Sequence, residues 1–267
     1  MSDARGPESL ETGWLAGTPA GDTLLRRYVL ANAEWMEAVA RASGRPVLRT
    51  DDLVVVDEHS PHLLMNTGIL VRPVEPGREE AIVADLAEFF TGGDEPYSLF
   101  CPWPTDLAGL VVVGHPPLML RPAASAVPPV PPGLEIAVAT VREELDEYEQ
   151  VLVDGFPLAE LQPWRSGVVF HPANLHVPGV QFFVGRAGGR AVTVAMSIVG
   201  CGVNHVEFVA TMPDARGRGY GEAVTWAATM AAPELPSLLI ASDMGRPVYE
   251  RMGYLALVRW TLLVGRR

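Results

Sequence analysis

The sequence predicts a mixed α/β protein built of two domains. Its 267 residues exceed the usual size of one compact domain, and 48% of them are hydrophobic, which suffices for two cores. Helical and strand patterns alternate on both sides of a proline-rich segment, 127–133 (VPPVPPG). Clustered prolines favour an extended connector. We therefore expect an N-terminal extension over 1–23, a first domain over 24–126, a linker over 127–133 and a second domain over 134–267.

In the first domain, apolar spacing predicts helices over 24–43 and 79–90. In the second of these, Ile82, Leu86 and Phe89 recur on one helical face. Runs rich in branched side chains predict the strands between and after these helices, over 53–56, 63–71, 107–113 and 118–121.

The second domain is expected to run strand, helix, three strands, loop, helix, strand, helix, strand. The sequence RAGG at 186–189 suits a tight turn between two hairpin strands, so the sheet should be mostly antiparallel. The expected strands are 134–140, 180–185, 191–198, 203–211, 237–241 and 255–264, with helices from Val141, over 220–230 and from Arg246.

Charge and composition exclude several classes of protein. The net charge of −12 argues against a nucleic-acid partner, which would require a basic face. Cys101 and Cys201 have no metal-like spacing and are expected to be reduced thiols. Neither a signal-peptide pattern nor an apolar run of about 20 residues occurs. We therefore expect a soluble, cytoplasmic protein with no membrane partner.

The most informative segment is 209–222 (VATMPDARGRGYGE). It runs from an apolar strand through a proline into glycines and then into a helix. Glycines let backbone N–H groups approach a ligand, and a helix start adds unpaired donors with partial positive charge, which together suit a pyrophosphate. A P-loop is excluded because the chain has no lysine, and a Rossmann loop would not follow antiparallel strands. On these residues alone, a structural turn explains the glycines equally well.

Two motifs resemble a known family. Arg216-x-x-Gly219-x-Gly221 resembles the R/Q-x-x-G-x-G/A signature of the GNAT (GCN5-related N-acetyltransferase) superfamily, with Pro213 where members often have proline. The segment 242–254 (SDMGRPVYERMGY) resembles the family's Y-x-x-x-G-[FY] ending after the fifth strand. The resemblance covers 134–264, about half of the chain. It implies the GNAT fold, a mixed and mostly antiparallel sheet flanked by helices, and a tandem protein whose first half is a degenerate copy without the signature.

The resemblance also implies acetyl-CoA as co-substrate, with no metal. In the family, the strand before the loop pairs with pantetheine and can hold the thioester oxyanion, while the loop amides bind the pyrophosphate. The residues implied to bind it are Val209, Ala210, Thr211, Arg216, Gly217, Arg218, Gly219, Tyr220, Gly221, Glu222 and Ser242.

The implied catalytic residues are Tyr249, Glu207 and His205. Tyr249 lies where relatives place the acid that protonates the thiolate, and the alternative is an aromatic side chain that only packs beneath the helix. His205 and Glu207 precede Arg216 by eleven and nine residues, where relatives place the base, and they share a strand face. Which of the two is the base stays open. Structural roles are the alternative for both.

Other polar residues give weaker signals. His171, Asn174 and His176 fall where relatives line the acceptor site, or in a solvated loop. His59 and His62 lack a third partner for a metal site.

The expected function is an N-acetyltransferase that acts on a primary amine of a small molecule or peptide by direct attack. Two alternatives remain. One is a different acyl-CoA reaction, such as longer-acyl transfer or thioester decarboxylation. The other is a non-enzymatic CoA-binding sensor or partner module. The first half is expected to wall off the acceptor pocket, to mediate homodimerisation or simply to support the second.

Overall fold

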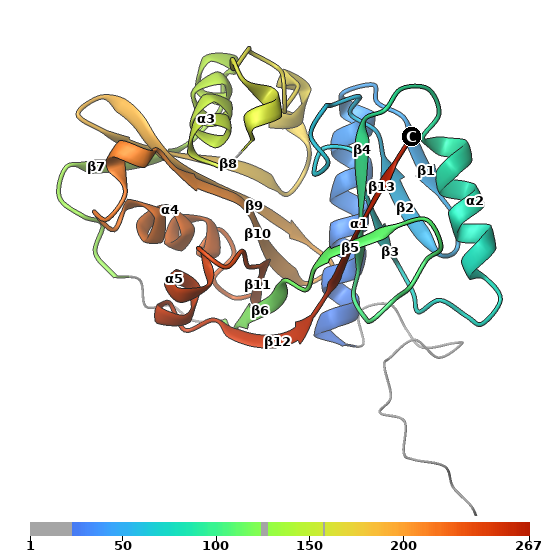
Figure 1. Cartoon of the computed structure of the whole chain (residues 1–267). Coiled ribbons are helices and arrows are strands. Elements are labelled where there is room, and N and C mark those ends of the chain that lie inside the picture. Colours follow the sequence, from blue (N-terminus) through green and yellow to red (C-terminus); the bar gives the residue numbers. More distant parts are fainter. Residues whose placement is uncertain (1–22, 124–127, 157) are drawn as a thin grey trace, which may run out of the picture.

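The computed structural model describes residues 23–123, 128–156 and 158–267. It consists of two sheets with helices packed against them, side by side in Figure 1. The predicted mixed α/β fold, with mostly antiparallel sheets flanked by helices in two tandem units, is confirmed. The expected N-terminal extension lies outside the described residues except for Thr23, as does Val127 of the expected linker.

The first sheet has six strands, and only β3 and β4 pair in parallel. Its helix α2 (Glu79–Phe89) connects these two strands, and α1 (Leu24–Ala42) precedes the sheet in the chain. In spatial order the strands are β1 (Val47–Arg49), β2 (Leu53–Val56), β3 (Thr67–Leu70), β4 (Pro96–Cys101), β13 (Thr261–Arg266) and β5 (Val111–Gly114).

The second sheet has seven strands, and its parallel pair is β10 with β11. The helices of this half are α3 (Arg142–Gly155), α4 (Tyr220–Thr229) and α5 (Arg246–Arg251). In spatial order the strands are β12 (Leu255–Arg259), β6 (Pro117–Arg121), β11 (Ser237–Ile240), β10 (Val203–Thr211), β9 (Arg190–Gly200), β8 (Val180–Ala187) and β7 (Leu134–Val138).

The two halves exchange their last strands. Strand β6 lies between β11 and β12 of the second sheet, and β13 lies between β4 and β5 of the first. The expectation of one strand over 255–264 is therefore wrong. The chain leaves the second sheet at Trp260, whose side chain is fully buried and whose backbone N–H donates to the carbonyl of Pro116. The expected domain boundary within 127–133 stays a prediction, since the sheets themselves do not divide there.

Three other expectations differ from the structure. Strands β1 and β4 were not predicted. The strand expected over 63–71 shrinks to β3, because the Asn66 side chain donates to the carbonyls of Ser60 and Pro96 and holds the preceding residues in turns. The strand expected over 107–113 begins only at Val111.

Helices cover both faces of the second sheet, as Figure 1 shows. Alternate side chains of β8 divide between these layers. Phe182 packs in the core beneath α3, and Phe183 packs in the core beneath α4. Helix α1 contacts strands of both sheets, among them β2 and β10. Side chains of α1, which belongs to the first half, therefore lie next to β10, the strand on which the site is built.

Candidate active site

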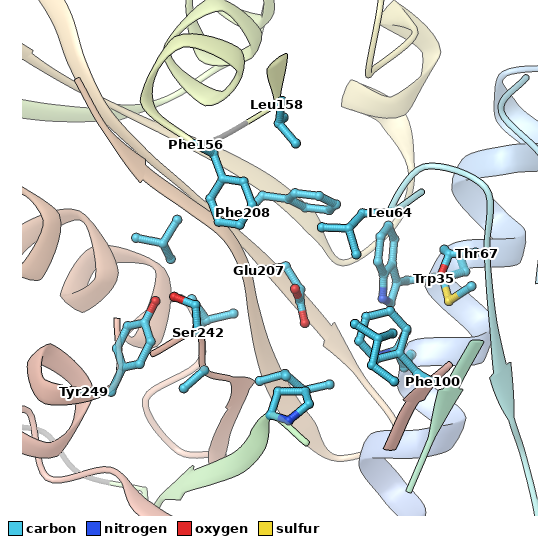
Figure 2. A pocket seen from close by; sticks show the side chains of 18 residues that line it. Trp35, Leu64, Thr67, Phe100, Phe156, Leu158, Glu207, Phe208, Ser242 and Tyr249 are labelled. Carbon is cyan, nitrogen blue, oxygen red and sulfur yellow. The ribbon is translucent and has the colours of Figure 1, made fainter. Parts of the chain in front are cut away.

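A cavity opens where β10 and β11 part. The strands pair only through Asn204 with Ser237 and His205 with Leu238. Beyond them β10 carries a bulge, where Phe208 and Val209 stand opposite the single residue Ala195 of β9. Because a bulge bends its strand, β10 leaves β11 at this point. The cavity that results has a volume of about 250 Å³ (Figure 2).

Phe208 in this bulge has a φ of +50°, a left-handed conformation that is strained for an aromatic residue. The hydroxyl of Tyr148, on α3, donates to the Phe208 carbonyl at 3.3 Å. The Phe208 ring also packs edge-on against Trp35 and Phe170. These contacts offset the strain and fix the shape of the bulge.

Both halves of the chain line the cavity. The second half contributes residues of β10, the end of β11, the α3 terminus and α5: Phe156, Leu158, Val206, Glu207, Phe208, Val209, Ile240, Ala241, Ser242 and Tyr249. The first half and β13 contribute the facing wall: Asn32, Trp35, Met36, Leu64, Thr67, Phe100, Pro116 and Leu262. The second sheet alone would therefore leave the cavity without one wall.

Glu207 and His205 lie together, as their shared strand face predicts. The Nε2 atom of His205 is 2.6 Å from Oε1 of Glu207, and the hydroxyl of Tyr28 on α1 donates to the same oxygen at 3.2 Å. The Glu207 side chain is 23% exposed and lines the cavity, whereas His205 is fully buried behind it. Only Glu207 can therefore meet a substrate.

The surroundings of His205 fix its orientation. Its ring contacts Tyr28 edge-on at 4.5 Å and Trp35 at 6.2 Å between ring centroids. Its Nδ1 atom is buried and has no hydrogen-bond partner within the described residues. With the proton on Nε2, where the Glu207 carboxylate accepts it, Nδ1 is a bare lone pair rather than an orphaned donor.

Tyr249 lies across the cavity from the aromatic wall. In Figure 2, Tyr249 and Ser242 lie on one side of Glu207, and Trp35 and Phe100 on the other. Burial raises the pKa of Tyr249 well above that of an ordinary tyrosine, and the charge of Glu207 raises it further. The phenol therefore stays protonated at neutral pH and can donate a proton.

The glycine-rich loop forms a second hollow, of about 330 Å³, at the start of α4. Gly217 and Gly219 have φ values of +74° and +78°, so glycine suits both positions. Within the described residues, no side chain caps the helix that begins at Tyr220. Its first-turn N–H groups have no intrahelical acceptor, an arrangement that suits an anion. We call the loop 216–221 the glycine cradle. Thr211, Gly221 and Glu222 line the same hollow, whereas Arg218 is exposed outside it.

Arg216 is exposed and lines this hollow, and its guanidinium bends back to the backbone of neighbouring elements. Its guanidinium donates to the carbonyl of Gly155 at 2.7 Å and to that of Thr211 at 3.2 Å. A Cβ atom on Gly155 would lie 3.0 Å from the backbone of Thr211, so the end of α3 packs closely on the end of β10. Sequence reasoning missed Gly155, because its only signal is the absence of a side chain at a helix end.

The weaker candidates lie elsewhere. Asn174 is buried and donates to the carbonyl of Val39 and to Ser43, so it joins its loop to α1. His171 caps that same short turn through its side chain. His62 lies 3.8 Å from Glu160, and no group of three metal-ligating side chains occurs in the described part of the chain.

The first half has no matching cradle between β3 and α2. There Arg72 and Arg78 both bind the buried carboxylate of Asp52, each at 2.6 Å. The connection has a single open glycine, Gly77, and the N–H of Gly77 already donates to the Glu79 side chain at 2.8 Å. Among the described residues, no helix is long and apolar enough to cross a membrane.

Comparison with known proteins shows similarity in structure only. The sequence matches no protein-family model and no curated protein. A GCN5-related N-acetyltransferase from Kribbella flavida matches in structure with a TM-score of 0.66 and 20% identity, over 91% of this chain and 96% of that one. A putative GNAT-family acetyltransferase from Novosphingobium aromaticivorans matches with a TM-score of 0.55 and 24% identity, over 86% and 97%.

A tandem GNAT protein from the clavulanic acid biosynthesis pathway matches with a TM-score of 0.50 and 13% identity, over 93% of this chain and 97% of that one. Each of these alignments spans both halves of the chain, and identities this low speak for the fold. The chain has the two-domain fold of the GCN5-related N-acetyltransferases.

Proposed function

We propose that the protein is an acyl-CoA-dependent N-acyltransferase that transfers an acetyl group from acetyl-CoA to a primary amine. One observation carries the proposal: Thr211 joins the glycine cradle to the strand whose bulge opens the cavity of Glu207 and Tyr249. A pyrophosphate at the amides of 216–221 would leave a pantetheine arm running along Val209, Ala210 and Thr211. Its thioester would then end between the two ionisable side chains.

Each of these side chains transfers a proton during the reaction. The ammonium form of the amine, paired with Glu207, first loses one proton to solvent. As the neutral nitrogen then bonds to the thioester carbonyl carbon, Glu207 accepts a second proton from it. Amides at the β10 bulge stabilise the oxyanion. The carbon–sulfur bond breaks, and Tyr249 gives its phenolic proton to the sulfur. The proton on Glu207 returns through solvent to the phenolate, which restores the enzyme and leaves an amide and free CoA.

His205 is assigned a positioning role rather than that of the base. It does not line the cavity, and its Nε2 atom contacts the same carboxylate oxygen that Tyr28 contacts. These two donors hold the Glu207 carboxylate in one orientation and leave its other oxygen for the amine. The geometry thus favours Glu207 over His205, a choice that the sequence left open.

The first test is direct. The protein is incubated with acetyl-CoA and a mixture of primary amines, thiol release is followed, and the products are identified by mass. We expect an amine heavier by one acetyl group and, by calorimetry, one CoA bound per chain. Binding of CoA without any amide product would favour a sensor, and thiol release with an acceptor-independent product would favour another acyl-CoA reaction. Two CoA molecules per chain would contradict the assignment of a single cradle.

A further inference from the structure

The walls of the active-site cavity define which amine fits it. Among the described residues that line it, the ionisable groups are Glu207 and Tyr249, and neither arginine nor histidine is present. Most of the remaining lining is apolar or aromatic, with Asn32, Thr67 and Ser242 as the polar exceptions. One negative charge in an apolar chamber suits one cationic group attached to an uncharged body.

The order of the side chains gives the direction in which the acceptor lies. Tyr249 and Ser242 are on one side of Glu207, and Trp35, Phe100 and Leu64 are on the other (Figure 2). If the sulfur lies by Tyr249 and the amine nitrogen by Glu207, the rest of the amine points towards the wall that contains Trp35. The first half of the chain supplies this wall. It therefore helps to select the acceptor, although it has no glycine cradle.

We infer that the acceptor is a small primary monoamine with an apolar, preferably aromatic, body that packs against Trp35. This inference rests on the proposed function and goes further by naming the substrate class. The ammonium group pairs with Glu207, and an aromatic body adds ring-to-ring contact with Trp35. The apolar body gains free energy in proportion to the area it buries.

The same chamber disfavours three other classes of amine acceptor. An amino acid would bring a carboxylate next to Glu207 with no arginine to bind it. A polyamine would bury a second ammonium against apolar side chains, which is costly when the charge is unpaired. An aminoglycoside exceeds a cavity of about 250 Å³, since sites for drug-sized ligands measure roughly 300–1,000 Å³.

The experiment compares acceptors at saturating acetyl-CoA, with products identified by mass. The acceptors are phenethylamine, hexylamine, spermidine, glycine and kanamycin. We expect kcat/KM for phenethylamine to exceed that for spermidine, glycine and kanamycin at least tenfold, with hexylamine intermediate. A polar acceptor that is acetylated best would overturn the inference and leave the proposed function standing. If acetyl-CoA binds but no amine is acetylated, the proposed function itself fails.

A second arm asks whether the apolar wall holds the acyl chain instead. The best amine is tested with acetyl-, hexanoyl- and decanoyl-CoA. The inference predicts the highest kcat/KM with acetyl-CoA, and a preference for decanoyl-CoA would overturn it.

A matched pair of tryptophans tests the wall directly. Trp35 and Trp164 are both half-buried, but only Trp35 lines the cavity, while Trp164 donates to Glu149 beside α3. Trp35→Ala should raise KM for phenethylamine at least tenfold and change KM for acetyl-CoA far less. Trp164→Ala should change neither. Equal KM values in wild type and Trp35→Ala would contradict the placement of the amine, and unchanged circular dichroism confirms that the variants fold.

Discussion

The Nε2 atom of His205 lies 2.6 Å from Oε1 of Glu207, and the two side chains differ completely in their access to the cavity. Glu207 lines it, and His205 is buried behind Glu207 among aromatic rings. Residues two apart on a strand commonly share a face. Here the two residues share a face, but only Glu207 can contact a substrate, and His205 can only orient the Glu207 carboxylate.

Glu207→Gln is therefore expected to lower kcat by about 10²–10⁴-fold, because a general base usually accelerates a reaction by about that factor. The loss should be greatest at low pH, where free amine is scarce. His205→Gln keeps a donor and should cost about tenfold or less. The pH dependence of kcat for both variants is the measurement. A larger loss in His205→Gln than in Glu207→Gln would reverse the two roles.

Alanine substitutions at two glycines should distinguish a loss of CoA binding from the cost of backbone strain. Gly219 and Gly189 both have φ of +78°, and a Cβ atom on either meets no contact shorter than 3.6 Å. Alanine at either position should therefore cost a similar free energy of unfolding, about 1–2 kcal/mol. Only Gly219→Ala should weaken CoA binding, at least tenfold by calorimetry, because only its Cβ lies at the cradle. Equal CoA affinities in the two variants would place the pyrophosphate elsewhere.

Arg216 is expected to act on the loop rather than on the phosphate charge. Arg216→Ala removes hydrogen bonds to Gly155 and Thr211, so it should lower the free energy of unfolding by about 1–2 kcal/mol and weaken CoA binding with it. The slope of log Kd against log salt should match that of wild type, since no phosphate contact is lost. Arg218→Ala, at an exposed position, is the control and should retain wild-type stability. A shallower salt slope in Arg216→Ala would show that its guanidinium binds phosphate.

Glu58 predicts a pH-dependent stability. Burial raises the pKa of Glu58 from its ordinary 4.5 to about 7, and Asp57 adds to the rise, against the lowering effect of Arg45 3.3 Å away. Folding thus favours the protonated form. The protonated Glu58 carboxyl contributes its full share to the free energy of unfolding below pH 4.5, and this contribution is lost as the pH rises through 7.

Glu58→Gln should match wild type in denaturant unfolding at pH 4.5 and exceed it by roughly 2–3 kcal/mol at pH 8. Glu88→Gln, on the exposed face of α2, controls for the loss of one negative charge. If the difference between Glu58→Gln and wild type stays constant between pH 4.5 and pH 8, the carboxyl does not titrate in this range.

Local signals in the sequence predicted much of the fold and part of the site. The glycines at 217 and 219 mark a tight passage from strand to helix, and apolar spacing located α1 and α2 to within two residues. The exchange of β6 and β13 could not be predicted, because strand partners depend on contacts between residues far apart in the chain. For the same reason the sequence did not associate Tyr28 and Trp35 with the site, since a first-half helix brings them to β10 only in the folded protein.

Tyr249 and Tyr254 provide the most direct test of the account. Both are buried, but only Tyr249 lines the cavity, while the hydroxyl of Tyr254 is hydrogen-bonded to Thr229 and Ser237 at 2.7 Å each. Tyr254→Phe should therefore lower the free energy of unfolding and leave the rate of acetyl transfer unchanged. Tyr249→Phe should leave the free energy of unfolding unchanged and lower the rate of acetyl transfer.

The decisive measurement is the single-turnover rate at which acetylated phenethylamine forms from acetyl-CoA, determined by mass spectrometry for wild type and both variants. The account predicts acetylated product from wild type, a rate close to it for Tyr254→Phe, and a rate lower by about 10²–10⁴-fold for Tyr249→Phe with unchanged affinity for acetyl-CoA. Wild-type rates in Tyr249→Phe, or no acetylated amine from any acceptor with wild type, would contradict it.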